Sequence, residues 1–149
     1  MKVDTKAFGE IEIDDKQKIT IPKGLFGFED YTRYAIFDAE HQPFFWLQSL
    51  DVKEIAFILI NPFFFRKDYE INISNEEQGE IDLSSPENAL IFVIVTILND
   101  SPMTANLQGP IIINKQNMKG MQAILSDPKW RTKHDIMEEF KKSEKENRS

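Results

Sequence analysis

Two strongly apolar runs within residues 89–114 place the tightest limits on how this chain can fold. Residues 90–98 and 111–113 are rich in isoleucine and valine, and a polar segment that contains Pro102 and ends at Pro110 separates them. Such β-branched residues pack well on a pleated sheet, and the longer run is too short to span a bilayer. It is therefore predicted to be a strand that is buried on both faces.

Alternating apolar and polar residues predict further short strands on both sides of this stretch. Residues 6–14 and 18–22 are expected to form a hairpin that ends at Pro22, which cannot donate to a ladder. Other strands are expected at 34–38, 43–47, 54–61, 68–73 and 121–125, and short helical turns at 50–54 and 76–83. No long helix separates the strands, so the expected class is mainly β: a small antiparallel β-barrel-like domain with a C-terminal helix.

The length and the end of the chain indicate one domain with an extension. A chain of 149 residues suits a single core. From residue 135 helix formers dominate, and Ile136 and Phe140 lie four apart on one apolar stripe. We expect a barrel-like domain at 1–134 and a helical, partly disordered extension at 135–149. With no cysteine and no apolar leader, a cytoplasmic protein is expected.

The net charge of −7 limits the partners that the chain can bind. It disfavours nucleic acid, whose binding depends on neutralised phosphates, and it favours a basic protein. A plain solubilising role for this charge is the alternative. Residues 66–82, with six acidic and two basic side chains, form the most acidic region.

Signatures of catalysis are missing from the sequence. It has no P-loop, no G-x-S-x-G and no H-E-x-x-H, and its two histidines, His41 and His134, are isolated from each other. We therefore expect no enzyme activity, no metal and no cofactor. Two rival hypotheses remain: a β-barrel that binds a small apolar or sugar ligand among its aromatic rings, and a hydrolase with paired carboxylates.

Two aromatic triplets are candidate contact residues. They are Phe44, Phe45, Trp46, Phe63, Phe64 and Phe65. In a strand, the middle ring of a triplet points away from the other two, so at least one ring is expected on the surface, where it could anchor a partner. The alternative is that the rings fill the ends of the barrel. Asn106 is expected to hydrogen-bond either the protein's own loop or a partner's backbone. The glycines of the segment Gly24-Leu-Phe-Gly27 predict a tight turn with aromatic rings that plug one barrel end.

Several motifs in the same order resemble those of the flagellar assembly factor FliW family. They are P-K-G-L-F-G-F at 22–28, L-Q-S at 47–49, an apolar strand at 55–62 ending in proline, T-A-N-L at 104–107 and P-I-I-I-N at 110–114. The resemblance spans residues 8–134. The charged segment after His134 departs from the shorter ends typical of that family.

The resemblance implies a monomeric β-barrel-like protein without catalysis. FliW proteins bind newly made flagellin in the cytoplasm and antagonise CsrA, a basic translational repressor of flagellin mRNA, so that the two partners exchange on FliW. No direct contact with nucleic acid or membrane is expected. Glu76, Glu77 and Glu80, together with the C-terminal region, are expected to contact the CsrA-type partner. The two aromatic triplets and Asn106 are expected to contact flagellin.

Overall fold

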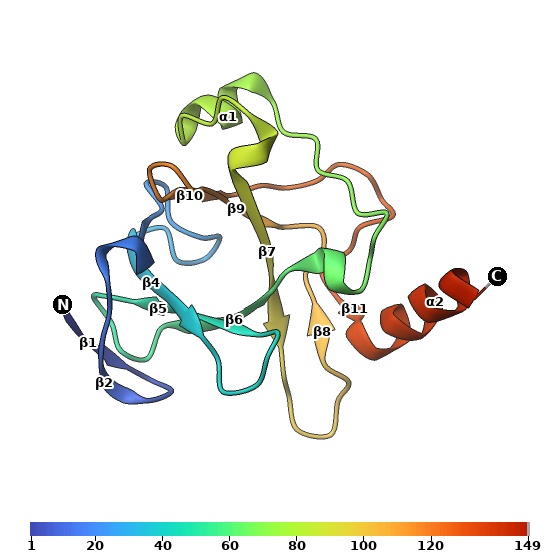
Figure 1. The fold of residues 1–149 in the computed structure, drawn as a ribbon, viewed down its shortest axis with the longest axis horizontal. Helices are drawn as coiled ribbons and strands as arrows, with labels where there is room; N and C mark the ends of the chain where they lie inside the picture. The colour runs from blue at the N-terminus through green and yellow to red at the C-terminus, as the bar shows by residue number, and fades with distance from the viewer. Residues whose placement is uncertain (149) are drawn as a thin grey trace.

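Short strands dominate the fold, and the two α-helices lie at its edge (Figure 1). The structure, a computed structural model, describes the backbone of residues 1–148 and the side chains of residues 1–142. The strands are β1 (Lys2–Thr5), β2 (Gly9–Glu12), β3 (Lys18–Thr20), β4 (Arg33–Asp38), β5 (Phe45–Ser49), β6 (Ala56–Ile60), β7 (Ala89–Thr96), β8 (Thr104–Ala105), β9 (Ile111–Asn114), β10 (Lys119–Gln122) and β11 (His134–Asp135). The helices are α1 (Asn75–Glu80) and α2 (Ile136–Arg148), with 3₁₀ turns η1 (Asp15–Gln17), η2 (Pro62–Phe64) and η3 (Pro86–Asn88).

β7 closes the main sheet into a barrel. It pairs antiparallel with β6 on one side and with β9 on the other, and the order between them is β6-β5-β4-β3-β10-β9. Seven strands therefore form a closed ring, and β8 and β11 extend the sheet from β7. One pair, β3 with β10, is parallel. The prediction of a mainly β, barrel-like domain with short helical turns and a C-terminal helix is confirmed.

Apolar side chains fill the interior of this barrel. One cluster joins residues from β3, β4, β5, β6, β7 and β9, so it lies inside the ring of strands. Its buried members are Ile19, Ile21, Leu25, Tyr34, Leu47, Leu59, Phe92, Ile111 and Ile113. A barrel packed in this way gives no support to a ligand held in its interior, because side chains already occupy the space.

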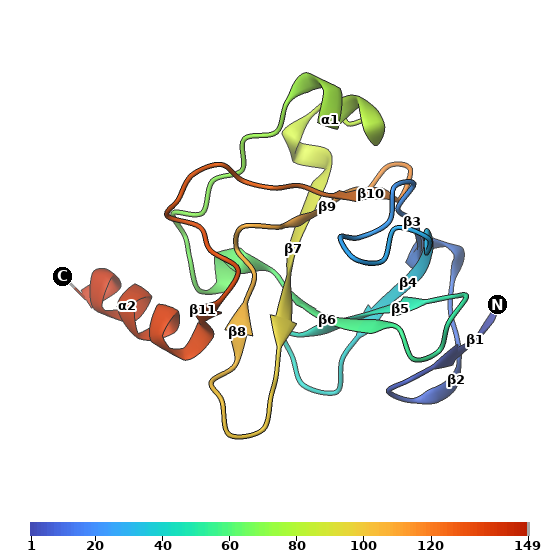
Figure 2. The ribbon, with the colours of Figure 1, turned by 180° about the vertical axis from the view of Figure 1, so that it is seen from behind.

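Three further apolar clusters coat the outside of the barrel. The β1–β2 hairpin packs on β4 and β5, and the chain after α1 packs on β9 and β10. On the third side, Phe65 and Tyr69, residues 125–130 and the start of α2 share an apolar cluster with β6, β7 and β8. Figure 2 shows α2 beside β11 and β8. The barrel is thus packed inside and covered by apolar clusters on three sides.

The predicted pairing of residues 6–14 with 18–22 is wrong. β2 pairs with β1, and β3 pairs with β4 and β10. The turn between β1 and β2 is tight: Gly9 has φ +68°, and Thr5 Oγ1 accepts the N–H of Phe8 at 3.0 Å. β1 is only four residues long, which is too short for a recognisable alternation.

Three other local predictions also differ from the structure. At residues 50–54 the Ser49 hydroxyl accepts the N–H groups of Asp51 and Val52, both at 3.1 Å, and this turn replaces the expected helical one. Within the described chain, residues 68–73 belong to no strand. β7 is buried on both faces only in its middle, because Leu90 and the residues after its end are exposed.

The apolar stripe predicted from the sequence attaches α2 to the barrel. Ile136 is fully buried, and the ring of Phe140 lies 6.1 Å from that of Phe65. The domain boundary at residue 134 stays a prediction. The expected disorder falls mainly on residues 143–149, whose side chains lie outside the described residues.

Candidate functional site

A groove with two exposed apolar walls lies between the loop at residues 23–29, α1 and β10. Its volume is about 660 Å³. Phe26 on one wall is 53% exposed and Ile124 on the other is 64% exposed, while Leu25 and Met121 are buried in its floor. Large apolar side chains held open to solvent around a concavity are typical of binding sites. The prediction that Phe26 plugs a barrel end is therefore wrong, whereas Phe28 does pack on the barrel cluster.

Hydrogen bonds through the side chain of Gln122 hold the loop at residues 23–29 in place. The N–H of Phe26 donates to Oε1 of Gln122 at 2.9 Å, and Nε2 of Gln122 donates to the carbonyl of Gly109 at 2.9 Å. Gly24 has φ +67°, and a Cβ there would lie 2.6 Å from Cα of Glu29. The groove is thus formed without a partner, which lowers the entropic cost of binding.

Carboxylates from α1 and from the loop form the rim of this groove. Glu77, Glu80 and Glu29 line it, against a single lining cation, Lys23. Lys23 donates to Glu80 at 2.5 Å, and this hydrogen bond raises the pKa of Lys23. Glu77 also caps its own helix, since it accepts the N–H of Ser74 at 3.1 Å. Glu76 is exposed on α1 and does not line the groove.

A second exposed apolar surface is the turn η2. The Asn61 side chain accepts the N–H of Phe63 at 2.9 Å and so starts a 3₁₀ turn at Pro62. The turn leaves Phe63 40% exposed and Phe64 53% exposed, and Phe65 is fully buried. Two neighbouring rings face solvent here because the segment is a turn, rather than the strand on which the sequence argument rested.

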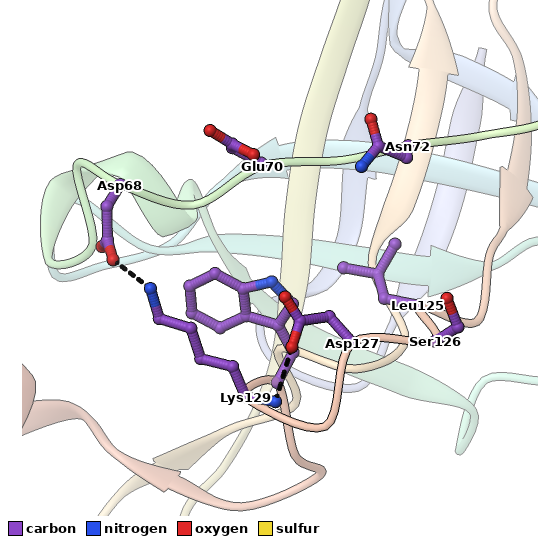
Figure 3. A pocket seen from close by; sticks show the side chains of 8 residues that line it. Asp68, Glu70, Asn72, Leu125, Ser126, Asp127 and Lys129 are labelled. Carbon is purple, nitrogen blue, oxygen red and sulfur yellow. Dashed lines mark hydrogen bonds and ion pairs between the residues drawn. The ribbon is translucent and has the colours of Figure 1, made fainter.

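A charged network joins this aromatic turn to α2. The guanidinium of Arg66 lies 4.7 Å from the centre of the Trp130 ring and donates to Asp68 and to Glu139, each at 2.9 Å. Lys129 stands 2.7 Å from Asp68 (Figure 3). The hydrogen bond from Arg66 holds the pKa of Asp68 well below its usual range. Burial alone would raise the pKa of Glu139, but hydrogen bonds from His134 and Arg66 outweigh it and lower that pKa.

The first aromatic triplet and Asn106 do not join these surfaces. Phe44, Phe45 and Trp46 are each half-buried and pack on three different apolar clusters. Oδ1 of Asn106 accepts the N–H of Gly109 at 2.9 Å, so its amide braces its own loop. The structure thus brings Glu77 and Glu80 to one groove, and Phe63 and Phe64 to another site.

Phe26, Gln122 and Ile124 line the groove but are not among the site residues predicted from the sequence. The signal for Phe26 was present in the glycine-flanked motif, but nothing local shows that its ring points outward. The described residues contain no helix long and apolar enough to cross a membrane. They also contain no group of three or more His, Cys, Asp or Glu side chains that could hold a metal ion.

Comparison with known proteins identifies the family. The sequence model of the FliW protein family matches residues 2–136. The chain belongs to the FliW family. The flagellar assembly factor FliW of Treponema denticola is 52% identical over 141 residues, which cover 94% of this chain and 96% of that protein. The FliW of Treponema pallidum is 48% identical, with 94% of each chain covered.

Two further matches extend this result to the fold and to the C-terminal segment. A solved crystal structure of the flagellar assembly factor FliW has a TM-score of 0.83 and 32% identity, covering 91% of this chain and 96% of that chain. The FliW of Leptospira biflexa is 43% identical and covers 97% of this chain and 96% of its own length. Its match must reach into α2, so the expectation that the segment after His134 departs from the family is wrong for this relative. A role in flagellar assembly follows from family membership.

Proposed function

We propose that this FliW protein acts without catalysis in the cytoplasm, where it binds flagellin and antagonises a CsrA-type translational repressor. The observation that carries the proposal is the pair of separate exposed apolar sites on one rigid acidic barrel. Two sites allow two partners, and differential affinity between them is enough to couple flagellin synthesis to secretion.

The groove beside α1 suits the basic repressor. Three carboxylates surround it, and Phe26 and Ile124 offer apolar anchors. Opposite charges speed the encounter of such partners, and the apolar centre supplies most of the lasting contact. Glu80 and Glu77 are the predicted acidic contacts that fit this role, and Glu76 lies beside them on the exposed helix.

The turn η2 suits flagellin. Phe63 and Phe64 are neighbouring exposed residues, and Phe65 after them contacts Phe140 of α2, so an amphipathic helix could lay its apolar face over the two exposed rings. Phe65 is part of the core and cannot contact a partner directly. The contacts of the half-buried Phe44, Phe45, Trp46 and Asn106 with their own chain favour a supporting role for these four residues in the fold.

Binding of purified full-length protein to the host's flagellin and to its CsrA homologue tests this proposal. Phe64→Ser should weaken the flagellin complex by about tenfold or more and leave the repressor complex unchanged, and Phe26→Ser should do the reverse. Ile97→Ser, which changes an exposed residue outside both sites, is the matched control. If the unaltered protein forms no complex with either partner at micromolar concentrations, the proposal is wrong.

A further inference from the structure

Residues 68–74 have the side-chain alternation of a strand but no strand beside them. Tyr69, Ile71 and Ile73 are buried or half-buried, and every residue between and around them is exposed. The alternation of apolar and polar residues in the sequence predicts a strand here. Within residues 1–148, however, none of these residues takes part in the sheets.

The main chain of this segment is left without partners. In the described chain, no hydrogen bond engages the N–H or C=O groups of Glu70, Ile71 or Asn72. At the ends, Tyr69 N–H donates to Arg66 and the carbonyl of Ile73 accepts from Gln78. Buried main-chain groups are nearly always paired, and the exposure of Glu70 and Asn72 fits unpaired groups that are open to solvent.

The ends of the segment are fixed, so it cannot shift to find a partner in its own chain. The Tyr69 hydroxyl donates to the carbonyl of Leu107 at 2.5 Å. At the other end Ser74 caps α1 by accepting the N–H of Glu77 at 3.1 Å. The result is a preformed, open strand edge, which natural proteins usually cover or blunt.

A second unpaired edge faces the same cavity. The N–H groups of Ala123 and Leu125 donate to the carbonyls of Pro110 and Gln108 at 2.9 and 2.8 Å. Successive residues of an extended chain point their main-chain groups to opposite sides. In the described chain the groups of Ile124 and Ser126 have no hydrogen-bond partner, so they belong to the other side. A cavity of about 230 Å³ lies between the two segments, lined by Glu70, Asn72, Leu125 and Ser126 among others (Figure 3).

The acidic residues that line this cavity favour a basic side chain as its occupant. Asp68, Glu70 and Asp127 line it against Lys129. Lys129 and Arg66 already pair with Asp68, and in the described chain no ion pair engages Glu70 or Asp127. Oδ1 of Asp127 accepts the N–H of Lys129 at 2.9 Å, so the carboxylate of Glu70 and the other oxygen of Asp127 are available to a cationic side chain from outside.

We propose that residues 70–73 are a docking edge for an extended peptide of another protein that carries lysine or arginine at alternate positions. The peptide adds a strand by exchanging main-chain hydrogen bonds with Glu70 and Asn72, and a basic side chain enters the acidic cavity. This inference does not rest on the proposed function, because it uses neither the groove beside α1 nor the turn η2.

Titration of the ¹⁵N-labelled full-length protein tests the proposal, with an acetylated peptide of alternating valine and lysine as the probe. Amide shifts should concentrate on residues 68–74 and 124–127. The same peptide with N-methyl groups on alternate amides keeps its charge but cannot pair as a strand, and it should bind at least about tenfold more weakly. Equal binding of the two peptides, or shifts spread over the acidic surface without regard to this segment, overturns the proposal.

Two matched variants separate main-chain from side-chain recognition. Asn72→Pro removes one N–H donor and should weaken binding by about tenfold, whereas Asn72→Ala keeps that donor and should bind as the unaltered protein does. If Asn72→Pro does not fold, the N-methyl comparison still decides. Sedimentation without peptide tests whether a second copy of this chain binds the edge. If the chain self-associates and the peptide does not displace the second copy, the edge is a contact between copies of this chain and the proposal is wrong.

Discussion

Gly24 shows how a single residue determines the shape of the groove. Its φ of +67° is unfavourable for any other residue, and a Cβ would lie 2.6 Å from both Cα of Glu29 and the carbonyl oxygen of Phe28. Gly27, three residues on, also has a positive φ of +86°, but a Cβ at this position would meet no atom of the described chain within 4 Å. A comparison of the two positions therefore separates the cost of a side chain at positive φ, which both positions share, from the cost of a clash, which arises only at Gly24.

Gly24→Ala should destabilise the protein more than Gly27→Ala. The second change costs about 1 kcal/mol, the usual penalty for a side chain at positive φ, and the first adds a clash with main-chain atoms that cannot move aside easily. Urea unfolding of both variants measures the difference. Equal losses of unfolding free energy would show that the loop has room to relax.

Tyr34 carries a buried polar group that the barrel leaves unsatisfied. Its hydroxyl has no hydrogen-bond partner among the described residues, and burial raises its pKa to about 12. Removing an unpaired polar atom from a core without changing the ring relieves its desolvation cost. Tyr34→Phe should therefore raise the free energy of unfolding by about 1 kcal/mol in a urea titration. A loss of stability would mean that the hydroxyl does have a stabilising contact.

Single residues could be predicted from the sequence only where the local pattern decides their conformation. The tight turn at Gly24 and Gly27 could be predicted, because glycine is the residue that allows positive φ. Strand alternation predicted that at least one ring of the second triplet is exposed, but it would not expose Phe63 and Phe64 together, as the 3₁₀ turn capped by Asn61 does. The inward packing of the first triplet depends on three outer clusters, and no local pattern reveals such distant contacts.

At the scale of elements, a buried network attaches α2 to the barrel. Nε2 of His134 accepts the N–H of Arg131 at 2.8 Å, so Nδ1 carries the proton and donates to Glu139 at 2.9 Å. Arg66 donates to the other oxygen of the same carboxylate. The ionised form of Glu139 thus links α2, β11 and the chain after η2.

Acid should loosen this attachment. The pKa of Glu139 is lowered in the folded protein from the usual 4.5, so its ionised form contributes stability above that pH, and the contribution is lost as pH falls through the lower folded value. Glu139→Gln should cost about 2 kcal/mol at pH 7 and flatten the dependence of stability on pH below about 4.5. Thermal unfolding between pH 7 and pH 3 measures both effects. An unchanged acid profile would contradict this role.

Elements could be predicted from the sequence better than their pairing. Most barrel strands follow from alternation or apolar runs, because each buries at least one face. The partners of β2 and β3 could not be predicted, because pairing depends on turn geometry and on a parallel contact with β10, which is far away in the sequence. Residues 68–73 are the instructive case: their side chains alternate between exposed and buried or half-buried as the pattern indicated, but in the described chain they form no strand, because no neighbouring strand pairs with them.

At the scale of the whole molecule, a net charge of −7 distinguishes the two proposed partners. A basic repressor meets an attractive field wherever it approaches, and the carboxylates around the groove concentrate that field at its site. In the proposed complex, flagellin at η2 would be held mainly by apolar contact with two phenylalanine rings. Salt screens the first interaction far more than the second, because the Debye length falls from about 10 Å to about 3 Å between about 0.1 M and 1 M salt.

The repressor complex should therefore weaken by about tenfold or more over that range of salt, mainly through a slower association rate, while the flagellin complex changes little. Surface plasmon resonance on the unaltered protein separates the two rates. Replacing Glu29 and Glu80 with glutamine should reduce the salt dependence of the repressor complex, and glutamine at Glu10 and Glu12, exposed on β2 and away from the groove, should change it less. The two double variants have the same net charge, so a difference between them can only come from where the charge lies. Equal effects would mean that the overall field alone steers the repressor and that the groove has no special part in its capture.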